Sequence, residues 1–211
     1  MEGSASAPAH PQIELEPPEW QPRAMWVGAR QLCGAISFFF ISFVFAYFYL
    51  RSLDPNKGWK IGHNINPSIG LGVAILVALV LSAAALRVAA RSGSREMIVR
   101  AGGAAVVLAL LAIVLQVIGW TVLGFGPASG GYASVYVGWT AFYNVVALAC
   151  VYWIETQVAT AWRRSRRGVT DTPAEVLTDT EVIQSGLDAC SFFWSFYVAN
   201  GLVLFVLLYL L

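Results

Sequence analysis

Long apolar runs separated by polar connections are the main pattern in this sequence. Five of these runs carry no charged residue, and each is long enough to cross the ~30 Å hydrocarbon core of a bilayer as a helix of about 20 residues. They are residues 31–50, 67–86, 101–125, 131–154 and 189–211. None alternates apolar and polar residues as the strands of a membrane β-barrel do. The pattern predicts an all-α, polytopic bundle of five transmembrane helices, forming one domain over residues 23–211.

The connection between the third and fourth runs is short and uncharged. Between Gln116 and Phe142 the chain ends one apolar run, turns through Gly124 to Gly131, and starts the next without a charged residue. Two apolar runs joined in this way are expected to be antiparallel neighbours in a bilayer. The turn is therefore the best-defined local feature of the sequence.

The N-terminal residues differ in composition from the apolar runs. Residues 1–22 are rich in Pro, Ala, Ser and Glu, a composition that cannot form a packed core. We therefore predict a disordered or extended tail over this segment. The alternative is that the tail docks on a partner subunit, for which Trp20 and Trp26 are the candidate contacts.

The longest connection, residues 155–188, has a basic half and an acidic half. Trp162, Arg163 and Arg164 come soon after the fourth run, where each basic side chain gains about 1 kcal/mol from anionic lipid headgroups. We predict that these three residues bind lipid, and the alternative is that the arginines only set the topology. In the acidic half, Thr172-Pro173-Ala174-Glu175 predicts the start of a short helix, because Pro suits the first helical position.

The basic residues also predict the orientation of the bundle. Of the thirteen Lys and Arg residues, ten fall in the N-terminal tail and in the second and fourth connections, and three fall in the first connection. Basic residues are enriched in cytoplasmic loops. We therefore expect the N-terminus to be cytoplasmic and the C-terminus to face outside.

Composition agrees with a membrane protein and narrows the function classes. The chain has 211 residues, of which 58% are hydrophobic and 12% charged, and its mean hydropathy is +0.66. Soluble proteins are typically ~25% charged. A net charge of +1 does not suggest a nucleic-acid partner. Cys33, Cys150 and Cys190 are far apart, a spacing that supports neither a metal site nor a disulfide framework.

The apolar runs contain no Asp, Glu, Lys, Arg or His. Proton and ion pathways usually need such groups inside the membrane, and haem needs axial ligands such as His or Met. We therefore predict no catalytic residue, cofactor or metal site in this chain. Gln116, Asn144 and Asn200 are better suited to hydrogen bonds between helices. These residues favour an assembly or stabilising subunit, with a standalone small-solute transporter as the alternative.

Four groups of residues have the order and spacing of a known family. The motif positions are Arg51 at the end of FFFISFVFAYFYLR, then Gln116 and Trp120, then Tyr132, Ser134, Thr140 and Phe142, and finally Trp194, Phe196 and Tyr209. Through them the chain, from about residue 32 to its last residue, resembles subunit III of the haem-copper terminal oxidases (cytochrome c oxidase subunit III). The similarity is to the five-helix form, which lacks the first two helices of the seven-helix version.

The chain departs from this family at the family's ionisable positions. Neutral residues stand there, namely Ile36, Gly119, Tyr143, Val146, Ser195 and Val198. The proton-antenna role attributed to those positions is therefore not carried over to this chain.

The resemblance implies a non-catalytic membrane subunit of a complex in a bacterial plasma membrane. Such a subunit stabilises the catalytic subunit I and holds membrane phospholipid, with subunit II as a further partner. The haem and copper are expected in the partner subunit. The complex reduces oxygen to water and pumps protons, with cytochrome c or a quinol as electron donor. A related alternative is the subunit III-like accessory protein of nitric oxide reductase.

Overall fold

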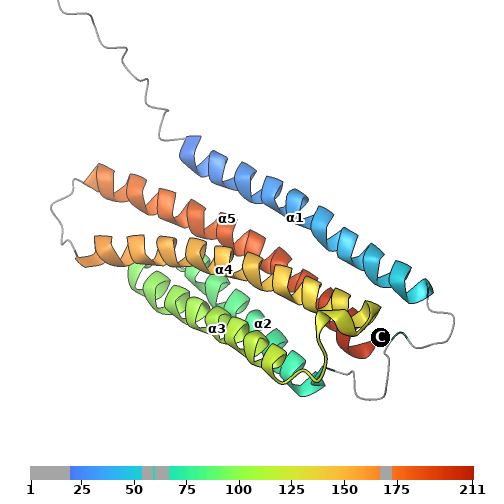
Figure 1. Ribbon diagram of the computed structural model, residues 1–211. Coiled ribbons are helices and arrows are strands. Elements are labelled where there is room, and N and C mark those ends of the chain that lie inside the picture. The colour runs from blue at the N-terminus through green and yellow to red at the C-terminus, as the bar shows by residue number, and fades with distance from the viewer. Residues whose placement is uncertain (1–19, 54–58, 60–66, 167–172) are drawn as a thin grey trace, which may run out of the picture.

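The computed structural model describes residues 20–53, 59, 67–166 and 173–211 (Figure 1). Within these ranges it contains helices and no strand. The elements are α1 (Trp20–Ser52), α2 (Ile69–Arg91), α3 (Arg95–Thr121), the 3-10 helix η1 (Pro127–Ser129), α4 (Gly131–Arg166), α5 (Pro173–Phe205) and the π-helix η2 (Val206–Leu210). The five α-helices are each long and apolar enough to cross a membrane, which confirms the predicted number and type of elements.

Several helices extend beyond the apolar runs that predicted them. α2 continues to Arg91 and α4 continues to Arg166, past the ends of the uncharged runs at residues 86 and 154. α5 begins at Pro173, so the short helix expected there is instead the first part of one long helix. The reason is that an apolar run marks the thickness of the hydrocarbon core, whereas the helical hydrogen-bond ladder can continue into the headgroup region.

The first helix begins inside the segment assigned to the tail. α1 starts at Trp20, and Pro22 lies in its first turn. Proline is tolerated there because the first N–H groups of a helix have no acceptor within the helix. The rest of the predicted tail, residues 1–19, lies outside the described residues. Trp26 packs on Phe192 of α5, with 5.5 Å between ring centroids, so this candidate for partner docking already has a contact within the chain.

The turn between α3 and α4 is closed by local hydrogen bonds. α3 ends at Thr121, so residues 122–125 of the predicted third span belong to the connection. The Ser134 hydroxyl donates to the carbonyls of Pro127 and Gly130, at 2.6 and 3.0 Å. Gly130 has φ = 145°, a conformation that L side chains rarely adopt. α3 and α4 are antiparallel neighbours, as the sequence predicts.

Helices α2 to α5 form a four-helix bundle, and α1 lies along one side of it (Figure 1). α2 packs most extensively on α3, α3 also packs on α4, and α5 packs on both α2 and α1. Small residues allow close approach at the α3–α4 contact, where a Cβ on Gly102 would lie 2.5 Å from Val158 Cγ2. Ser82 and Ala147 are also buried at contacts, whereas Gly70 and Ala149 are exposed. Only some of the small residues therefore mediate packing within the chain.

Candidate functional site

Three of the motif residues line a single cavity between α2, α3, α4 and α5. These residues are Gln116, Thr140 and Tyr209. A fourth, Trp120, donates its indole N–H to Thr140 Oγ1 at 3.0 Å, and Thr140 Oγ1 donates in turn to the carbonyl of Tyr136 at 2.7 Å. The bond from Trp120 to Thr140 thus joins motif positions of α3 and α4 through neutral groups.

Tyrosines of α4 hold the C-terminal π-helix in place. The Tyr132 hydroxyl donates to the carbonyl of Leu208, and the hydroxyls of Tyr136 and Tyr209 lie 2.8 Å apart. All three rings are buried. Buried tyrosine hydroxyls usually have a hydrogen-bond partner, and here those partners belong to the last turn of the chain. Two motif tyrosines, Tyr132 and Tyr209, together with Tyr136, therefore fix η2 on α4.

Of the remaining motif residues, two make their contacts within one helix and two make contacts between helices. Arg51 donates to the Tyr47 hydroxyl at 3.3 Å, within α1. Phe142 packs on Phe39 of α1, with 5.0 Å between ring centroids, and Phe196 packs near Phe193 on its own helix. Trp194 donates to Ser82 Oγ at 3.1 Å, and Ser82 Oγ donates to the Ala105 carbonyl at 2.8 Å. These last bonds connect α5, α2 and α3.

A pair of tyrosines that the sequence did not single out as partners joins α4 to α5. The Tyr143 hydroxyl donates to the Tyr197 carbonyl at 2.9 Å, and the Tyr197 hydroxyl donates to the Tyr143 carbonyl at 2.7 Å. The two rings are stacked with centroids 4.0 Å apart. A Cβ on Gly201 would collide with the Tyr143 hydroxyl. The sequence signal that could have indicated this pair is a tyrosine in each of two apolar runs, with Gly201 four residues after Tyr197.

The cavity has a volume of about 30 Å³ and a mixed lining. Most of its wall is apolar, but Gln116 and Asn144 project amide groups from α3 and α4 and are only 6% and 8% exposed. Tyr143 and Tyr197 contribute hydroxyls. The lining holds no carboxylate or imidazole, so its groups can form neutral hydrogen bonds but cannot act as a general acid or base near neutral pH.

The described residues contain no group of three or more His, Cys, Asp or Glu side chains that could hold a metal ion. The three cysteines are free thiols, with Cys150 and Cys190 buried and Cys33 half-buried. Thiols buried among apolar side chains in this way behave as small hydrophobic residues.

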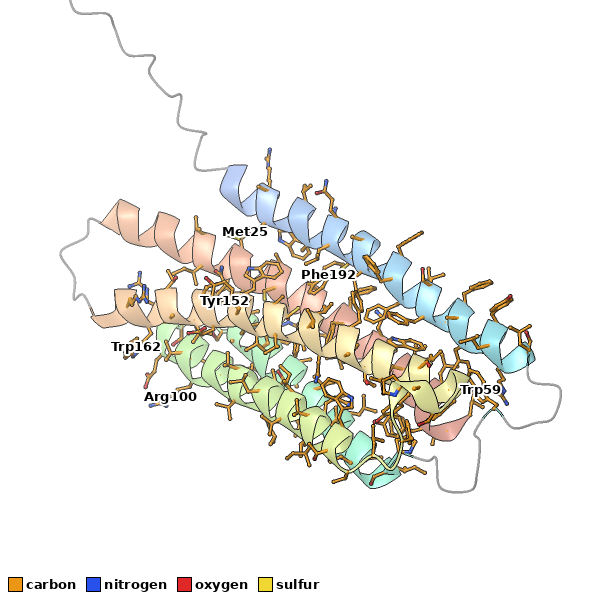
Figure 2. The ribbon with its side chains drawn as sticks, in the orientation of Figure 1. Met25, Trp59, Arg100, Tyr152, Trp162 and Phe192 are labelled. Carbon is orange, nitrogen blue, oxygen red and sulfur yellow. The ribbon has the colours of Figure 1, made fainter. Side chains whose placement is uncertain are left out.

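The predicted lipid-binding residues lie at the end of α4. Trp162 is 44% exposed and Arg163 is exposed. The side chain of Arg164 lies outside the described residues. Figure 2 shows Trp162 and Arg100 at one end of the bundle and Trp59 at the other. Arg100 forms a surface ion pair with Glu96 at 2.6 Å.

A groove on the outer surface between α2 and α5 was not anticipated as a site. It encloses about 510 Å³ and has Arg87 and Ser195 at one end. The rest of its lining is apolar: Leu76, Val80, Ala83, Ala84, Val198, Ala199 and Leu202. Arg87 Nε donates to Ser195 Oγ at 3.2 Å. Sequence reasoning used Arg87 only to predict topology; the missed signal was a lone arginine closing an apolar run that ends in small residues.

A scan of the chain against protein-family models found no match, and a search of curated proteins found none either.

Proposed function

We propose that this chain is a non-catalytic, subunit III-like membrane subunit of a haem-copper terminal oxidase in a bacterial plasma membrane, with its N-terminus in the cytoplasm. The main support is the set of motif residues, which occur in the family's order on four of the five apolar helices and on the π-helix η2 that follows the last of them. Several of them make contacts between elements: Trp120 bonds to Thr140, and Tyr209 bonds to Tyr136, a neighbour of the motif positions on α4. In this proposal the chain stabilises subunit I, alongside subunit II, while the complex reduces oxygen to water and pumps protons.

The haem and copper of the complex belong to the partner subunit in this proposal. The apolar runs of this chain contain no histidine, and the polar groups that line its internal cavity are amides and hydroxyls. These residues do not fit a haem or a copper site, so no redox step is assigned to them. The role of the chain is structural, because its neutral hydrogen bonds fix how the helices pack.

The groove between α2 and α5 supports a lipid-holding role. Its apolar wall fits an acyl chain, and Arg87 at its end carries the positive charge with which a phosphate would pair. Arg91 lies one turn further along α2 and lines the adjoining polar hollow together with Asp188. We therefore assign this groove to an anionic phospholipid, with the phosphate on the Arg87 guanidinium.

Purification under mild conditions tests the assignment to a complex. We expect an affinity-tagged chain, extracted from its native membrane in a mild detergent, to co-elute with a haem-bearing subunit and to show its reduced-minus-oxidised spectrum. Oxygen consumption by the eluted complex would support the oxidase assignment, whereas nitric oxide reduction would move the chain to the related accessory protein. A stable chain that elutes without any partner would contradict both.

Substitution of Arg87 tests the lipid assignment. Arg87→Gln should lower the amount of phosphatidylglycerol or cardiolipin that remains bound, measured by native mass spectrometry, because it removes a contact of about 1 kcal/mol. Arg87→Lys keeps the charge and should retain more lipid. The double variant Arg163→Ala/Arg164→Ala is the matched comparison at the end of α4. If Arg87→Gln retains all of its lipid and the double variant loses lipid, the lipid-binding site lies at the end of α4 and not in the groove.

The size of the internal cavity argues against a standalone transporter. Small-molecule sites usually measure about 300–1,000 Å³, whereas this cavity measures about 30 Å³. Solute flux into liposomes that contain only this chain would nevertheless support the transporter alternative. We expect no such flux.

A further inference from the structure

The internal cavity contains two amide groups without a hydrogen-bond partner. Gln116 Nε2 on α3 and Asn144 Nδ2 on α4 are buried, and neither makes a hydrogen bond of 3.5 Å or less to a described residue. The Gln116 side chain has only a weaker interaction, with the Tyr136 hydroxyl. Both side chains line the cavity, and both are more than nine-tenths buried. Buried polar groups are hydrogen-bonded in nearly all native structures, and an unpaired one calls for an explanation such as an ordered water.

The hydroxyls of Tyr143, Tyr197 and Thr140, which also belong to residues that line the cavity, can only accept hydrogen bonds. The hydroxyl protons of Tyr143 and Tyr197 are donated to each other's backbone carbonyls. The Thr140 hydroxyl proton is donated to the Tyr136 carbonyl. Each of these oxygens therefore has only lone pairs to offer to a ligand. The site presents amide donors from two helices and hydroxyl acceptors beside them.

This combination selects a ligand that both donates and accepts hydrogen bonds. An anion would accept hydrogen bonds from the amides but would be repelled by the hydroxyl lone pairs. A cation would be attracted by the lone pairs but repelled by the amide N–H groups. No charged residue lines the cavity to compensate an ion of either sign, and burying an uncompensated ion is costly. An apolar gas would leave both amides unpaired. Water satisfies both kinds of group.

The volume decides how much water the cavity can hold. One water molecule needs roughly 10–15 Å³ of space measured in this way, and the cavity measures about 30 Å³. There is room for one water or two, and not for a larger polar molecule.

We propose that the cavity is a hydration site in which one or two waters accept hydrogen bonds from Gln116 and Asn144 and donate to the neighbouring hydroxyls. The water links α3 to α4 deep in the bundle, where no protein group fills that position. This proposal does not depend on the oxidase assignment, because it rests only on groups within this chain.

Solid-state NMR of the isotopically labelled full-length chain in proteoliposomes tests this proposal directly. We expect magnetisation to transfer from water to the side-chain amides of Gln116 and Asn144. The backbone amide of Gly93, in the exposed connection between α2 and α3, provides a positive reference. Transfer to Gly93 without transfer to either side-chain amide would overturn the proposal.

Substitutions test whether the water bridges the two helices. In Asn144→Leu the Gln116 water signal should be lost, because the water loses one of its two amide partners. Asn200→Leu is the matched control, since the Asn200 amide is already bonded to the Phe196 carbonyl at 2.9 Å and does not line the cavity. The control should keep both water signals. A Gln116 signal that persists in Asn144→Leu would contradict the bridge.

A substitution that fills the cavity provides a second test, because the change in Tm has opposite signs for a hydrated and a dry cavity. Ala147 lines the cavity and is 1% exposed. Ala147→Val should displace the water, remove both amide signals and lower Tm, because two buried donors lose their acceptor. In a dry cavity the added methyl groups would fill empty space and raise Tm, and that result would overturn the proposal.

Discussion

At the scale of single residues, two adjacent glycines in α3 have different surroundings. A Cβ on Gly102 would lie 2.5 Å from Val158 Cγ2 of α4, which is closer than van der Waals contact allows. A Cβ on Gly103 would have no atom within 4 Å. Helix association in a membrane depends strongly on such close approach, because lipid provides no hydrophobic driving force between helices. The same substitution at the two positions should therefore have opposite effects.

We predict that Gly102→Ala destabilises the chain and Gly103→Ala does not. Overpacking at Gly102 should lower the free energy of unfolding by about 1–3 kcal/mol. At Gly103 the change should raise it by about 0.4–1 kcal/mol, because alanine restricts the unfolded chain and fits a helix. Both values can be measured by unfolding the chain in mixed micelles.

The clash at Gly102 has a specific partner, which provides a rescue experiment. Adding Val158→Ala to Gly102→Ala should recover most of the lost stability, because the offending methyl group is removed. Additive losses in the double variant would show that the two positions do not meet, since residues in contact are expected to be coupled.

Sequence reasoning recognised the polar residues of the spans but not how each would be used. Gln116 and Asn144 were expected to bond between helices. Both line a cavity with amide nitrogens that make no bond of 3.5 Å or less, and only Gln116 interacts across helices, weakly, with Tyr136. Asn200 bonds within its own helix, to Phe196. The type of residue indicates that a hydrogen bond is needed. The rotation of each helix about its axis decides where that bond goes, and in a span that is apolar on all sides the sequence does not determine that rotation.

At the scale of elements, α1 is the least buried of the five helices. Only 17% of its most apolar window is buried within the chain, against 33% to 50% for the other helices. Its inner face is held by aromatic contacts with α4, including the stacked pair Phe43–Trp139 at 5.7 Å. Phe40 is 3% exposed and packs near Phe142 and Tyr143.

We predict that Phe40→Ala loosens α1. The substitution leaves a cavity at the contact between α1 and α4, with a cost on the order of 2 kcal/mol from the cavity alone. Faster hydrogen exchange of α1 backbone amides than of α4 amides would locate the effect. The loss of stability can be measured in the same unfolding experiment as for the glycine variants.

Phe38→Ala is the matched control on the same helix. Phe38 is 72% exposed, so in a bilayer lipid takes the place of the missing ring and little stability should be lost. Equal losses for Phe38→Ala and Phe40→Ala would mean that α1 does not seat on α4 through this face.

The number of helices was predictable, whereas their ends were not. A run of about 20 apolar residues identifies a span, and all five runs lie in long helices. The end of such a run reports the edge of the hydrocarbon core, so the extension of α4 to Arg166 left no apolar signal. At the end of α3 the opposite occurs, because residues 122–125 are apolar and yet belong to a connection that contains Gly124, Gly126 and Pro127.

At the scale of the whole molecule, the position of α1 beside a bundle of α2 to α5 could not be predicted. Every span is apolar on all sides, so the pattern assigns no face to a neighbour. The short turn between α3 and α4 fixed one neighbouring pair only. The long contact between α2 and α5 joins helices that are far apart in the sequence. Its bond between Arg87 and Ser195 could not be predicted, because an arginine that closes an apolar run does not indicate which helix it will meet.

The helix order places the basic segments at one end of the molecule. The connection between α2 and α3 and the end of α4 lie at the same end, opposite the turn between α3 and α4 (Figure 1). Arg87, Arg91, Arg95 and Arg163 therefore belong to one end of the bundle. By the preference of basic residues for the cytoplasm, that end is expected to be cytoplasmic.

Single-cysteine labelling checks this orientation. After Cys33, Cys150 and Cys190 are replaced by Ala, a cysteine is introduced at Ser94 or at Ala128, both exposed and at opposite ends. Ala128→Cys should react with a membrane-impermeant maleimide in intact spheroplasts, and Ser94→Cys should react only after lysis. The reverse result would place the basic end outside and would contradict the expected cytoplasmic N-terminus.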